Sequence, residues 1–441
     1  MKLIVCGDLL FSSRHLASRM DQRITEDLRE ADAVFGNAEF CTPEVDTAPA
    51  IGRGYVTAVT PDTLKEFAEL HIQLVNFANN HTGDFGVQGI LDTLHAAEKE
   101  HLTALGIGRN LSEARKTHFA DTPSGRIAVV SAGSTRSEVF AASDPGSGIA
   151  GRPGSNPLRW HRAYVLPEKE FDELRRIDEL LGTANSRREG ERIETFPSQE
   201  DDRFKFGSLF EGNLQIERGD HAYVRTWADP KDEKALLRRI DDAAKRSDFV
   251  LATLHTHEGR NENWYDDRPA AFVEEFARKA IDAGASAFVG HGAHFLKGVE
   301  IYKGKPIFYN IGSLIMEFEA GESKMPWEMF EAYGYGPDAL PSDLHRNRIK
   351  DQKGRFIGFG SERRFSQNVY IRFDIGADHT FSYQLVPLDL DMTRDNPLKR
   401  GWPEIATAEE GKRITERLQA ISKAYGTQFH YNEKSGTISV L

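Results

Sequence analysis

Cysteine is nearly absent from this chain of 441 residues, which contains only Cys6 and Cys41. We expect both to be reduced, buried thiols. A redox switch is the alternative, because each cysteine lies two residues from a candidate metal ligand. Other familiar signatures are also missing: the sequence has no paired Cys-x-x-Cys zinc motif, no Gly-x-Ser-x-Gly nucleophile elbow and no Walker-type phosphate loop.

Long apolar runs are missing as well. No stretch approaches the roughly 18 apolar residues that a membrane-spanning helix needs. The apolar run at residues 3–5 is followed too soon by Asp8 and Arg14 to form a signal peptide. We therefore expect this run to be the first strand and the protein to be cytoplasmic.

The chain also lacks an excess of positive charge, since its formal net charge is −12. Neither nucleic acid nor a membrane is therefore expected as a partner. Hydrophobic residues at 39% and charged residues at 28% fit a globular protein. Local basic patches could still hold an anionic substrate, and we expect that substrate to be a small molecule or a peptide.

Short apolar runs alternate with helical segments, the rhythm of a layered α/β fold. A helix is expected to begin near Thr60-Pro61, and a capping box formed by Thr407 and Glu410 predicts another helix near the C-terminus. Residues 369–373 and 381–386 alternate in polarity and predict an antiparallel pair of strands.

We expect one domain over residues 1–441, with insertions at about 136–225 and 319–365 and C-terminal strands and a helix at about 366–441. The first insertion contains a charged helical stretch at 168–181 and a polar run at 183–202. It either lies over the site or is a solvated surface loop.

Polar clusters follow several of the apolar runs. They are Gly7-Asp8, Gly36-Asn37-Ala38-Glu39, Asn79-Asn80-His81, His255-Thr256-His257 and Gly290-His291-Gly292-Ala293-His294. In an open α/β sheet, ligands bind where parallel strands end. Carboxylate, amide and imidazole groups also ligate divalent metals. The clusters therefore predict one shared metal site.

Two neighbouring ions need a bridging carboxylate and terminal oxygen or imidazole ligands. Asp8 and His294 could hold the first ion, and Glu39 could bridge. The second ion would be held by Asn80, His255 and His291. His81 would then face the substrate. Mixed nitrogen and oxygen ligands suit manganese, iron, zinc or magnesium.

In this order the motifs resemble the CapA-like, poly-γ-glutamate synthesis branch of the calcineurin-like metallophosphoesterase superfamily. The matching motifs are Gly7-Asp8, Gly36-Asn37-Ala38-Glu39, Ala78-Asn79-Asn80-His81 with Asp84 and Gly86, Leu254-His255 and Gly290 to His294. The segment Gly304 to Gly312 also matches. The resemblance covers residues 1–135 and 245–318. It implies a four-layer α/β/β/α sandwich in which His81 stabilises or protonates and in which the metal ligands are Asp8, Glu39, Asn80, His255, His291 and His294.

The chain departs from this pattern at three places. Leu10 stands where the superfamily often has a histidine, His-Trp-Gly is replaced by His255-Thr256-His257, and Gly-His-His-Pro-His is replaced by Gly290 to His294. The first metal site is therefore expected to be poor in ligands. The extra imidazole of His257 and the neighbouring Glu258 are candidates for proton transfer.

The leading functional hypothesis is a metal-dependent hydrolase. A metal-activated water would attack a phosphoester or a peptide or γ-glutamyl amide, and His81 would be the general acid. One alternative is a metal-assisted peptide epimerase or isomerase that uses His257 and Glu258. Another is a non-catalytic factor in poly-γ-glutamate synthesis.

Four further residues are candidates for substrate binding. Arg14, Arg159 and Arg260 could clamp a carboxylate or phosphate. Trp264 could stack on the substrate, although core packing is the simpler role for a tryptophan. A structural or solvated role is the alternative for each arginine.

Overall fold

The computed structural model describes residues 1–197, 200–210, 212–317 and 324–441. Its centre is a ten-stranded sheet with the order β21-β22-β19-β18-β1-β2-β3-β4, in which β17 also pairs with β1 and β20 with β19. The parallel strands are β1 (Lys2–Leu10), β2 (Ala33–Ala38), β3 (Leu74–Asn76), β4 (Thr103–Leu105) and β17 (Ser313–Met316). The antiparallel ones are β18 (Gln367–Ile375), β19 (Phe381–Asp389), β20 (Glu404–Ile405), β21 (Phe429–Asn432) and β22 (Thr437–Val440).

A six-stranded sheet with the order β15-β16-β14-β13-β7-β6 packs against the first. Its parallel strands are β7 (Gly125–Gly133), β13 (Phe249–Thr256), β14 (Ala287–Gly292) and β16 (Lys305–Phe308). The antiparallel strands β6 (His118–Thr122) and β15 (Val299–Tyr302) form its edges. Between the sheets lies an apolar core that includes Val5, Phe35, Val129 and Leu251.

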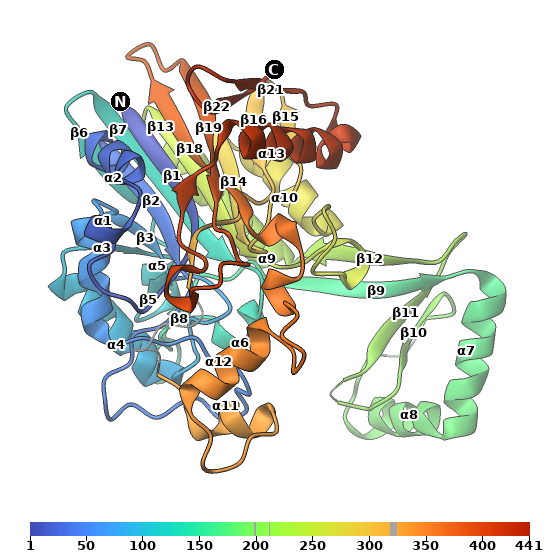
Figure 1. The fold of residues 1–441 in the computed structure, drawn as a ribbon. Coiled ribbons are helices and arrows are strands. Elements are labelled where there is room, and N and C mark those ends of the chain that lie inside the picture. The colour runs from blue at the N-terminus through green and yellow to red at the C-terminus, as the bar shows by residue number, and fades with distance from the viewer. Residues whose placement is uncertain (198–199, 211, 318–323) are drawn as a thin grey trace.

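Helices cover the outer face of each sheet (Figure 1). The ten-stranded sheet is covered by α1 (Leu16–Arg19), α2 (Gln22–Glu30), α3 (Lys65–Glu69) and α4 (Gly86–Lys99). The six-stranded sheet is covered by α9 (Pro230–Ala244) and α10 (Ala271–Asp282). Their apolar faces form two further cores, so the molecule is a four-layer α/β/β/α sandwich. This confirms the predicted fold class.

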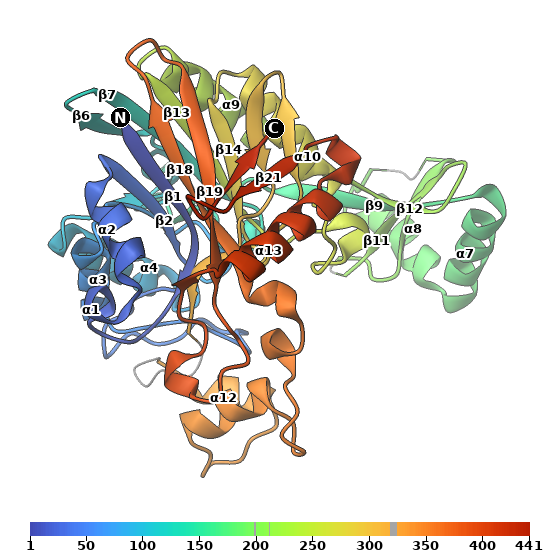
Figure 2. The same ribbon diagram turned by 45° about the horizontal axis from the view of Figure 1, so that its top comes forward.

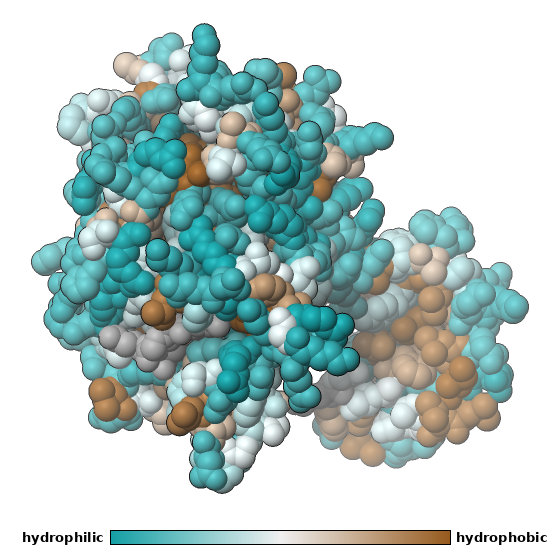
Figure 3. Space-filling model, in the orientation of Figure 1, coloured by the Kyte–Doolittle hydropathy of each residue, from teal (hydrophilic) through white to brown (hydrophobic). Residues whose placement is uncertain are grey.

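An arm projects from the sandwich at residues 160–228 (Figures 1 and 2). Its sheet has the order β10-β11-β9-β12, with β9 (Trp160–Leu166), β10 (Arg203–Phe206), β11 (Leu214–Arg218) and β12 (Tyr223–Ala228). It also contains α7 (Glu168–Leu181) and α8 (Thr183–Ile193), and α8 occupies the start of the polar run at 183–202. Apolar side chains gather on the arm's exposed surface (Figure 3), among them Leu180, Leu181 and Phe210.

The remaining elements are short or lie towards the C-terminus. They are β5 (Ile107–Gly108) paired with β8 (Gly154–Ser155), and α5 (Leu111–Ala114), α6 (Ser137–Phe140), α11 (Trp327–Ala332), α12 (Pro341–Ile349) and α13 (Ala408–Ile421). Turns of 3₁₀ helix occur at Pro61–Leu64, Arg260–Glu262, Gly358–Gly360, Arg363–Phe365, Pro397–Lys399 and Lys423–Tyr425. Among the described residues, none of the helices combines the length and apolarity needed to cross a membrane.

Several local predictions are confirmed. The helix expected near Thr60-Pro61 is a 3₁₀ turn that continues into α3. Thr407 caps α13 by accepting a hydrogen bond from the backbone N–H of Glu410 at 3.3 Å. Strands β18 and β19 pair in antiparallel fashion, as the alternation over 369–373 and 381–386 predicts.

Candidate metal centre

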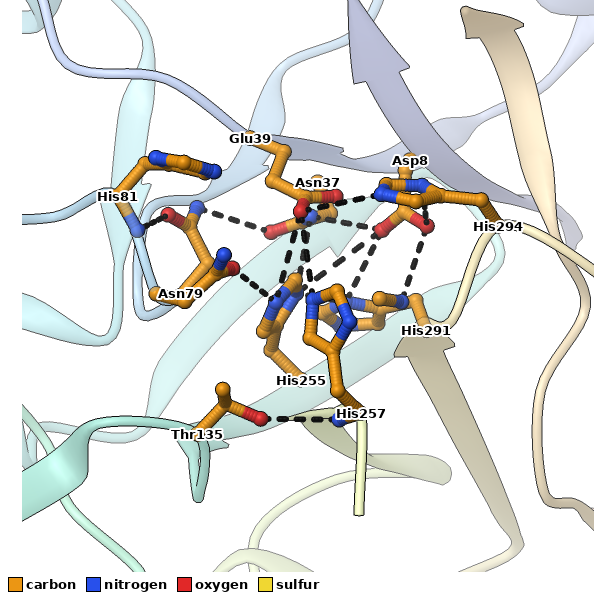
Figure 4. Close-up of polar contacts among 12 residues, drawn as sticks. Asp8, Asn37, Glu39, Asn79, His81, Thr135, His255, His257, His291 and His294 are labelled. Atoms are coloured by element: carbon orange, nitrogen blue, oxygen red, sulfur yellow. Dashed lines mark hydrogen bonds and ion pairs between the residues drawn. The ribbon is translucent and has the colours of Figure 1, made fainter. Parts of the chain in front are cut away.

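The carboxyl ends of the central strands of both sheets converge on one buried cluster of polar side chains (Figure 4). Asp8 lies in β1, and Glu39 follows β2 directly. Strands β13 and β14 run parallel in a register that places His255 opposite His291. A parallel strand delivers its last residues to the same edge as its neighbours. The cluster is therefore a direct consequence of strand order and register.

Close backbone packing brings these strand ends together. A side chain at Gly7 would place its Cβ only 1.8 Å from the carbonyl oxygen of Gly312. Gly292 has a φ of 111°, and a Cβ there would lie 2.9 Å from the ring of His255. Glycine is needed at both positions because any larger residue would push a ligand-bearing segment out of place.

The first group of donors consists of Asp8, His255 and His291. The Asp8 Oδ1 atom lies 3.6 Å from Nδ1 of His291 and 4.0 Å from Nδ1 of His255. The two Nδ1 atoms are 3.2 Å apart. Donors about 2.0–2.2 Å from one shared ion are about 3–3.6 Å from each other. The spacing of this triad is thus close to that of ligands around one ion.

The second group consists of Glu39, His257 and His294. The Glu39 Oε1 atom lies 3.5 Å from Nε2 of His257 and 3.5 Å from Nε2 of His294. It is also 3.8 Å from Nε2 of His255. In addition, His294 Nδ1 lies 3.3 Å from Asp8 Oδ2, so the two triads adjoin one another.

This grouping differs from the one expected from sequence. His294 was paired there with Asp8, but the structure places it in the Glu39 triad while keeping it beside Asp8. His257, a candidate for proton transfer from sequence, joins the donors of the same triad. Asn80, expected from sequence to be a ligand, lies beside the donors: its side-chain oxygen is 2.7 Å from Nε2 of His255.

Amide groups hold the Asp8 carboxylate in place. Asn37 Nδ2 donates to Asp8 Oδ1 at 2.8 Å, and the backbone N–H of Gly292 donates to Asp8 Oδ2 at 2.9 Å. Asn37 in turn accepts a hydrogen bond of 2.7 Å from Asn76 Nδ2. The sequence motif contains Asn37, but reasoning from sequence gave it no role; here it orients a metal-ligand candidate.

Several buried atoms of the cluster lack a partner. Among the described residues, no hydrogen bond reaches either carboxylate oxygen of Glu39, Nε2 of His257 or Nε2 of His291. Buried polar atoms are nearly always bonded in native proteins, and unbonded ones call for an explanation. Bound cations provide one, because carboxylate oxygens and imidazole nitrogens are metal donors.

The pKa values of the cluster agree with a site for bound cations. Burial, with the charge of Asp8 as a smaller cause, raises the pKa of Glu39 well above its usual value. Burial also lowers the pKa of His255 and of His257 well below the usual value, so both imidazoles are neutral, the form that ligates metals. For Asp8, burial opposes ionisation, but His291 and His294 beside it bring its pKa well below the ordinary value. The donor set thus fits divalent ions.

His81 lies next to the donors without belonging to either triad (Figure 4). Its Nδ1 is 2.6 Å from Asp84 Oδ2, and its Nε2 is 3.3 Å from the hydroxyl of Thr57. Arg53 donates to Asp84 Oδ1 from Nε at 2.9 Å, and the backbone N–H of Thr57 donates to Oδ2 at 2.8 Å. Asp84 therefore orients the ring of His81.

Glu258 does not point at the triads. Its Oε2 atom accepts hydrogen bonds from the hydroxyls of Ser134, Thr135 and Thr256 at 2.6, 2.9 and 2.8 Å. Burial raises the pKa of Glu258, and the three hydroxyls counteract part of that rise. Thr135 also accepts a hydrogen bond from the backbone N–H of His257 at 2.9 Å. Glu258 thus anchors the segment that carries His257, and the isomerase hypothesis stays a prediction.

The arginines proposed from sequence bind elsewhere. Arg14 donates to the hydroxyls of Thr60 and Thr63, and Arg159 donates to Asp232. Arg260 is exposed beside Asp266. Trp264 does lie at the site, because its ring centroid is 4.9 Å from that of His257.

A cavity of about 190 Å³ is lined by the Glu39 triad, Asn80 and His81. Residues that the sequence left without a role complete its wall: Arg53, Tyr55, Arg136, Arg348 and Phe359. No local pattern marks these residues. Arg348 lies in α12, Phe359 lies in a 3₁₀ turn and the others lie outside helices and strands, so their approach to the site depends on the packing of distant segments. The cavity therefore combines metal donors, a histidine–aspartate pair and three guanidinium groups, a set suited to an anionic ligand.

The chain is similar to one family model, to several known proteins and, weakly, to solved structures. The family model described as "Bacterial capsule synthesis protein PGA_cap" matches residues 2–317. An uncharacterized protein of Sinorhizobium fredii, y4sH, is 28% identical over 448 residues, which cover 99% of this chain and 92% of that protein. The PGA biosynthesis protein CapA of Bacillus subtilis is 22% identical over 302 residues, covering 68% of this chain and 57% of that protein. A crystal structure described as a novel phosphatase, from Mycoplasma pneumoniae, aligns with a TM-score of 0.40 at 11% identity over 91% of this chain and 96% of its own.

Proposed function

Because this chain belongs to the PGA_cap family of bacterial capsule synthesis proteins, and because its donor triads adjoin His81, we propose that it is a metal-dependent hydrolase of an anionic substrate. The single observation that carries the proposal is the pair of buried triads with unbonded donor atoms beside an oriented histidine. The bond to be broken is a phosphoester or a peptide or γ-glutamyl amide.

The residues that would hold the ions are Asp8, His255 and His291 for one, and Glu39, His257 and His294 for the other. A donor set with four imidazoles favours a transition metal over magnesium. When bound, such ions supply Lewis acidity and activate water for attack at phosphorus or at a carbonyl carbon.

His81 would carry out the proton transfer to the leaving group. Asp84 lies at Nδ1, so Nε2 would be the proton donor; it is 3.3 Å from the hydroxyl of Thr57, and both residues line the cavity. A protonated His81 would donate its Nε2 proton to the oxygen or nitrogen that departs, while Asp84 stabilises the imidazolium. Arg53 keeps Asp84 in place for this step.

The arginines of the cavity wall would bind the substrate's negative charge. Arg53 is already bonded to Asp84, and Arg348 donates to the hydroxyl of Tyr55 at 2.6 Å. Arg136 makes no hydrogen bond or ion pair through its guanidinium with any described residue, and it lines the cavity. It is therefore the best placed of the three to contact an anionic group directly.

The test is turnover by metal-loaded protein of two chromogenic probes, p-nitrophenyl phosphate and γ-glutamyl-p-nitroanilide. Turnover of either one by the wild type identifies the bond class. His81→Asn should lower turnover about 10²- to 10⁴-fold without changing metal content. The loss should be larger for an alkyl phosphate than for the p-nitrophenyl ester, because a poor leaving group needs the proton more. An equal loss for both esters would contradict the proton-donor role.

A second candidate is a binding role in capsule polymer synthesis, favoured by the family match and by the name of the Bacillus subtilis relative. In that case the loaded protein would turn over neither probe nor poly-γ-glutamate, yet it would bind that polymer. Turnover and binding measured on the same preparation separate the two functions.

A further inference from the structure

A second and larger cavity of about 500 Å³ lies beside the metal cavity, where the arm meets the sandwich. The sandwich contributes Thr135, Glu258 and Gly259 to its wall, and the arm contributes Lys205, Leu214 and Gln215. The mechanism proposed above uses none of these residues.

The two cavities share part of their walls. Arg136 and Trp264 line both of them. Trp264 also contacts His257 of the Glu39 triad, with 4.9 Å between the ring centroids. A molecule that occupies the metal cavity and passes these two side chains therefore enters the cavity at the base of the arm.

The size of the metal cavity limits what it can hold. Its volume of about 190 Å³ equals roughly six water molecules at about 30 Å³ each. This space suits a phosphate or an amide with its nearest substituents. Any larger substrate must extend beyond it, and the cavity at the base of the arm provides the adjoining space.

The charged groups around the second cavity differ in how they are already bonded. Glu258 accepts from three hydroxyls, and Glu262 pairs with Arg162 at 2.5 Å and also accepts from Tyr164. By contrast, the side chains of Arg136 and Lys205 form no hydrogen bond or ion pair with other described residues. The charges left for a ligand are thus mainly positive, with Glu138 the exception on this wall.

Aromatic and amide groups complete this wall. Trp160 stacks on Phe272 with 5.2 Å between ring centroids and an interplanar angle of 6°, which fixes its position. Asn213 and Gln215 lie on the arm side. Such a wall of fixed rings and hydrogen-bonding amides suits an elongated polar chain rather than an apolar ligand.

We infer that this cavity is a second subsite of the same active site, which holds the non-reacting part of an elongated anion. Arg136 contacts the chain where it leaves the metal cavity, and Lys205 contacts a further negative group at the arm. The inference rests on the proposed function, because the reacting bond is taken to lie at the triads. The arm then selects substrates by length and charge.

Isothermal titration calorimetry on the full-length, metal-loaded protein tests this. The probes are hexaglutamate, diglutamate and the neutral hexapeptide Gly-Ser-Gly-Ser-Gly-Ser. Hexaglutamate should bind at least tenfold more tightly than either of the others. Lys205→Glu should weaken hexaglutamate binding about three- to tenfold, the range for an exposed ion pair that is lost and reversed. Lys169→Glu is the matched control on the arm, because Lys169 lies on α7 and lines neither cavity.

Equal affinity for hexaglutamate and diglutamate, or equal behaviour of the two lysine variants, would overturn the inference. Tripolyphosphate is titrated in parallel, and if it binds more tightly than hexaglutamate and loses affinity in Lys205→Glu, the same subsite takes phosphate groups. Turnover of p-nitrophenyl phosphate by the wild type separates the two proposals. Turnover without length-dependent binding refutes the subsite alone, whereas length-dependent binding without turnover of any probe refutes the hydrolase alone.

Discussion

Replacing Glu39 by glutamine should change stability in opposite directions in the metal-free and metal-loaded protein. Glu39 is fully buried, neither of its oxygens is hydrogen-bonded within the described residues, and burial raises its pKa. Without metal, burial and the neighbouring charge of Asp8 disfavour its ionised form. The substitution keeps the shape of the side chain and removes the charge, so it should stabilise the metal-free fold.

The size of the effect follows from opposing contributions. An uncompensated buried charge costs several kcal/mol, while a buried amide without partners costs about 1–3 kcal/mol. We therefore expect a net gain of about 1–2 kcal/mol in the metal-free variant. For a chain of 441 residues the entropy of unfolding is about 0.9 kcal/mol/K, so the unfolding midpoint should rise by about 1–2 °C.

In the metal-loaded protein the same substitution should lower the unfolding midpoint. An ion at about one hundred times its dissociation constant stabilises a protein by about 2.7 kcal/mol, which corresponds to about 3 °C here. Glu39→Gln should lose that increment for the ion of its triad. Scanning fluorimetry of wild type and variant, each with EDTA and with added Mn²⁺ or Zn²⁺, measures all four midpoints.

A pH series adds a second check. Because the folded-state pKa of Glu39 lies above its unfolded value, the folded protein takes up the proton as pH falls. The metal-free wild type should therefore gain stability relative to the variant as pH decreases towards about 4.3, the ordinary pKa of a glutamate. If Glu39→Gln lowers both midpoints equally at every pH, Glu39 is a structural residue and this reasoning is wrong.

Three further predictions follow from other contacts. Asp84→Asn should lower turnover about 10- to 100-fold with unchanged metal content, because it releases the ring of His81; unchanged kcat in steady-state assays would count against that. Burial lowers the pKa of Lys297 to about 8, below its unfolded value of about 10.5. In urea titrations the wild type should therefore gain stability relative to Lys297→Met as pH rises from about 8 to 10.5. A stability difference between the two proteins that does not change over this pH range would refute the prediction. Gly7→Ala should destabilise the fold by about 3 kcal/mol in the same titrations, since its Cβ would meet Gly312; a loss below about 0.5 kcal/mol would show that the loop yields.

The functional residues at the strand ends could be predicted from sequence because neighbouring parallel strands run in the same direction. An apolar run followed by Asp8 or by His291 indicates both that a strand is present and at which end its functional residues lie. The antiparallel pair β18 and β19 was equally accessible, because alternation with a period of two is a local property.

How the donors divide into two triads could not be predicted from sequence. Whether His294 faces Asp8 or Glu39 depends on how the two sheets stack, which no local pattern encodes. The same holds for the arginines. Arg14 and Arg159 are satisfied by Thr60, Thr63 and Asp232, and Arg136 reaches the cavity from a loop. Long side chains at the surface can turn in many directions, so sequence alone does not select among them.

The most direct test of the central claim is the metal content of the purified, reconstituted protein by elemental analysis. The wild type should hold about two ions per chain. His291→Ala and His257→Ala, which remove one donor from different triads, should each retain about one. No ions in the wild type after reconstitution, or the same content in both variants as in the wild type, would contradict a dinuclear centre built from these residues.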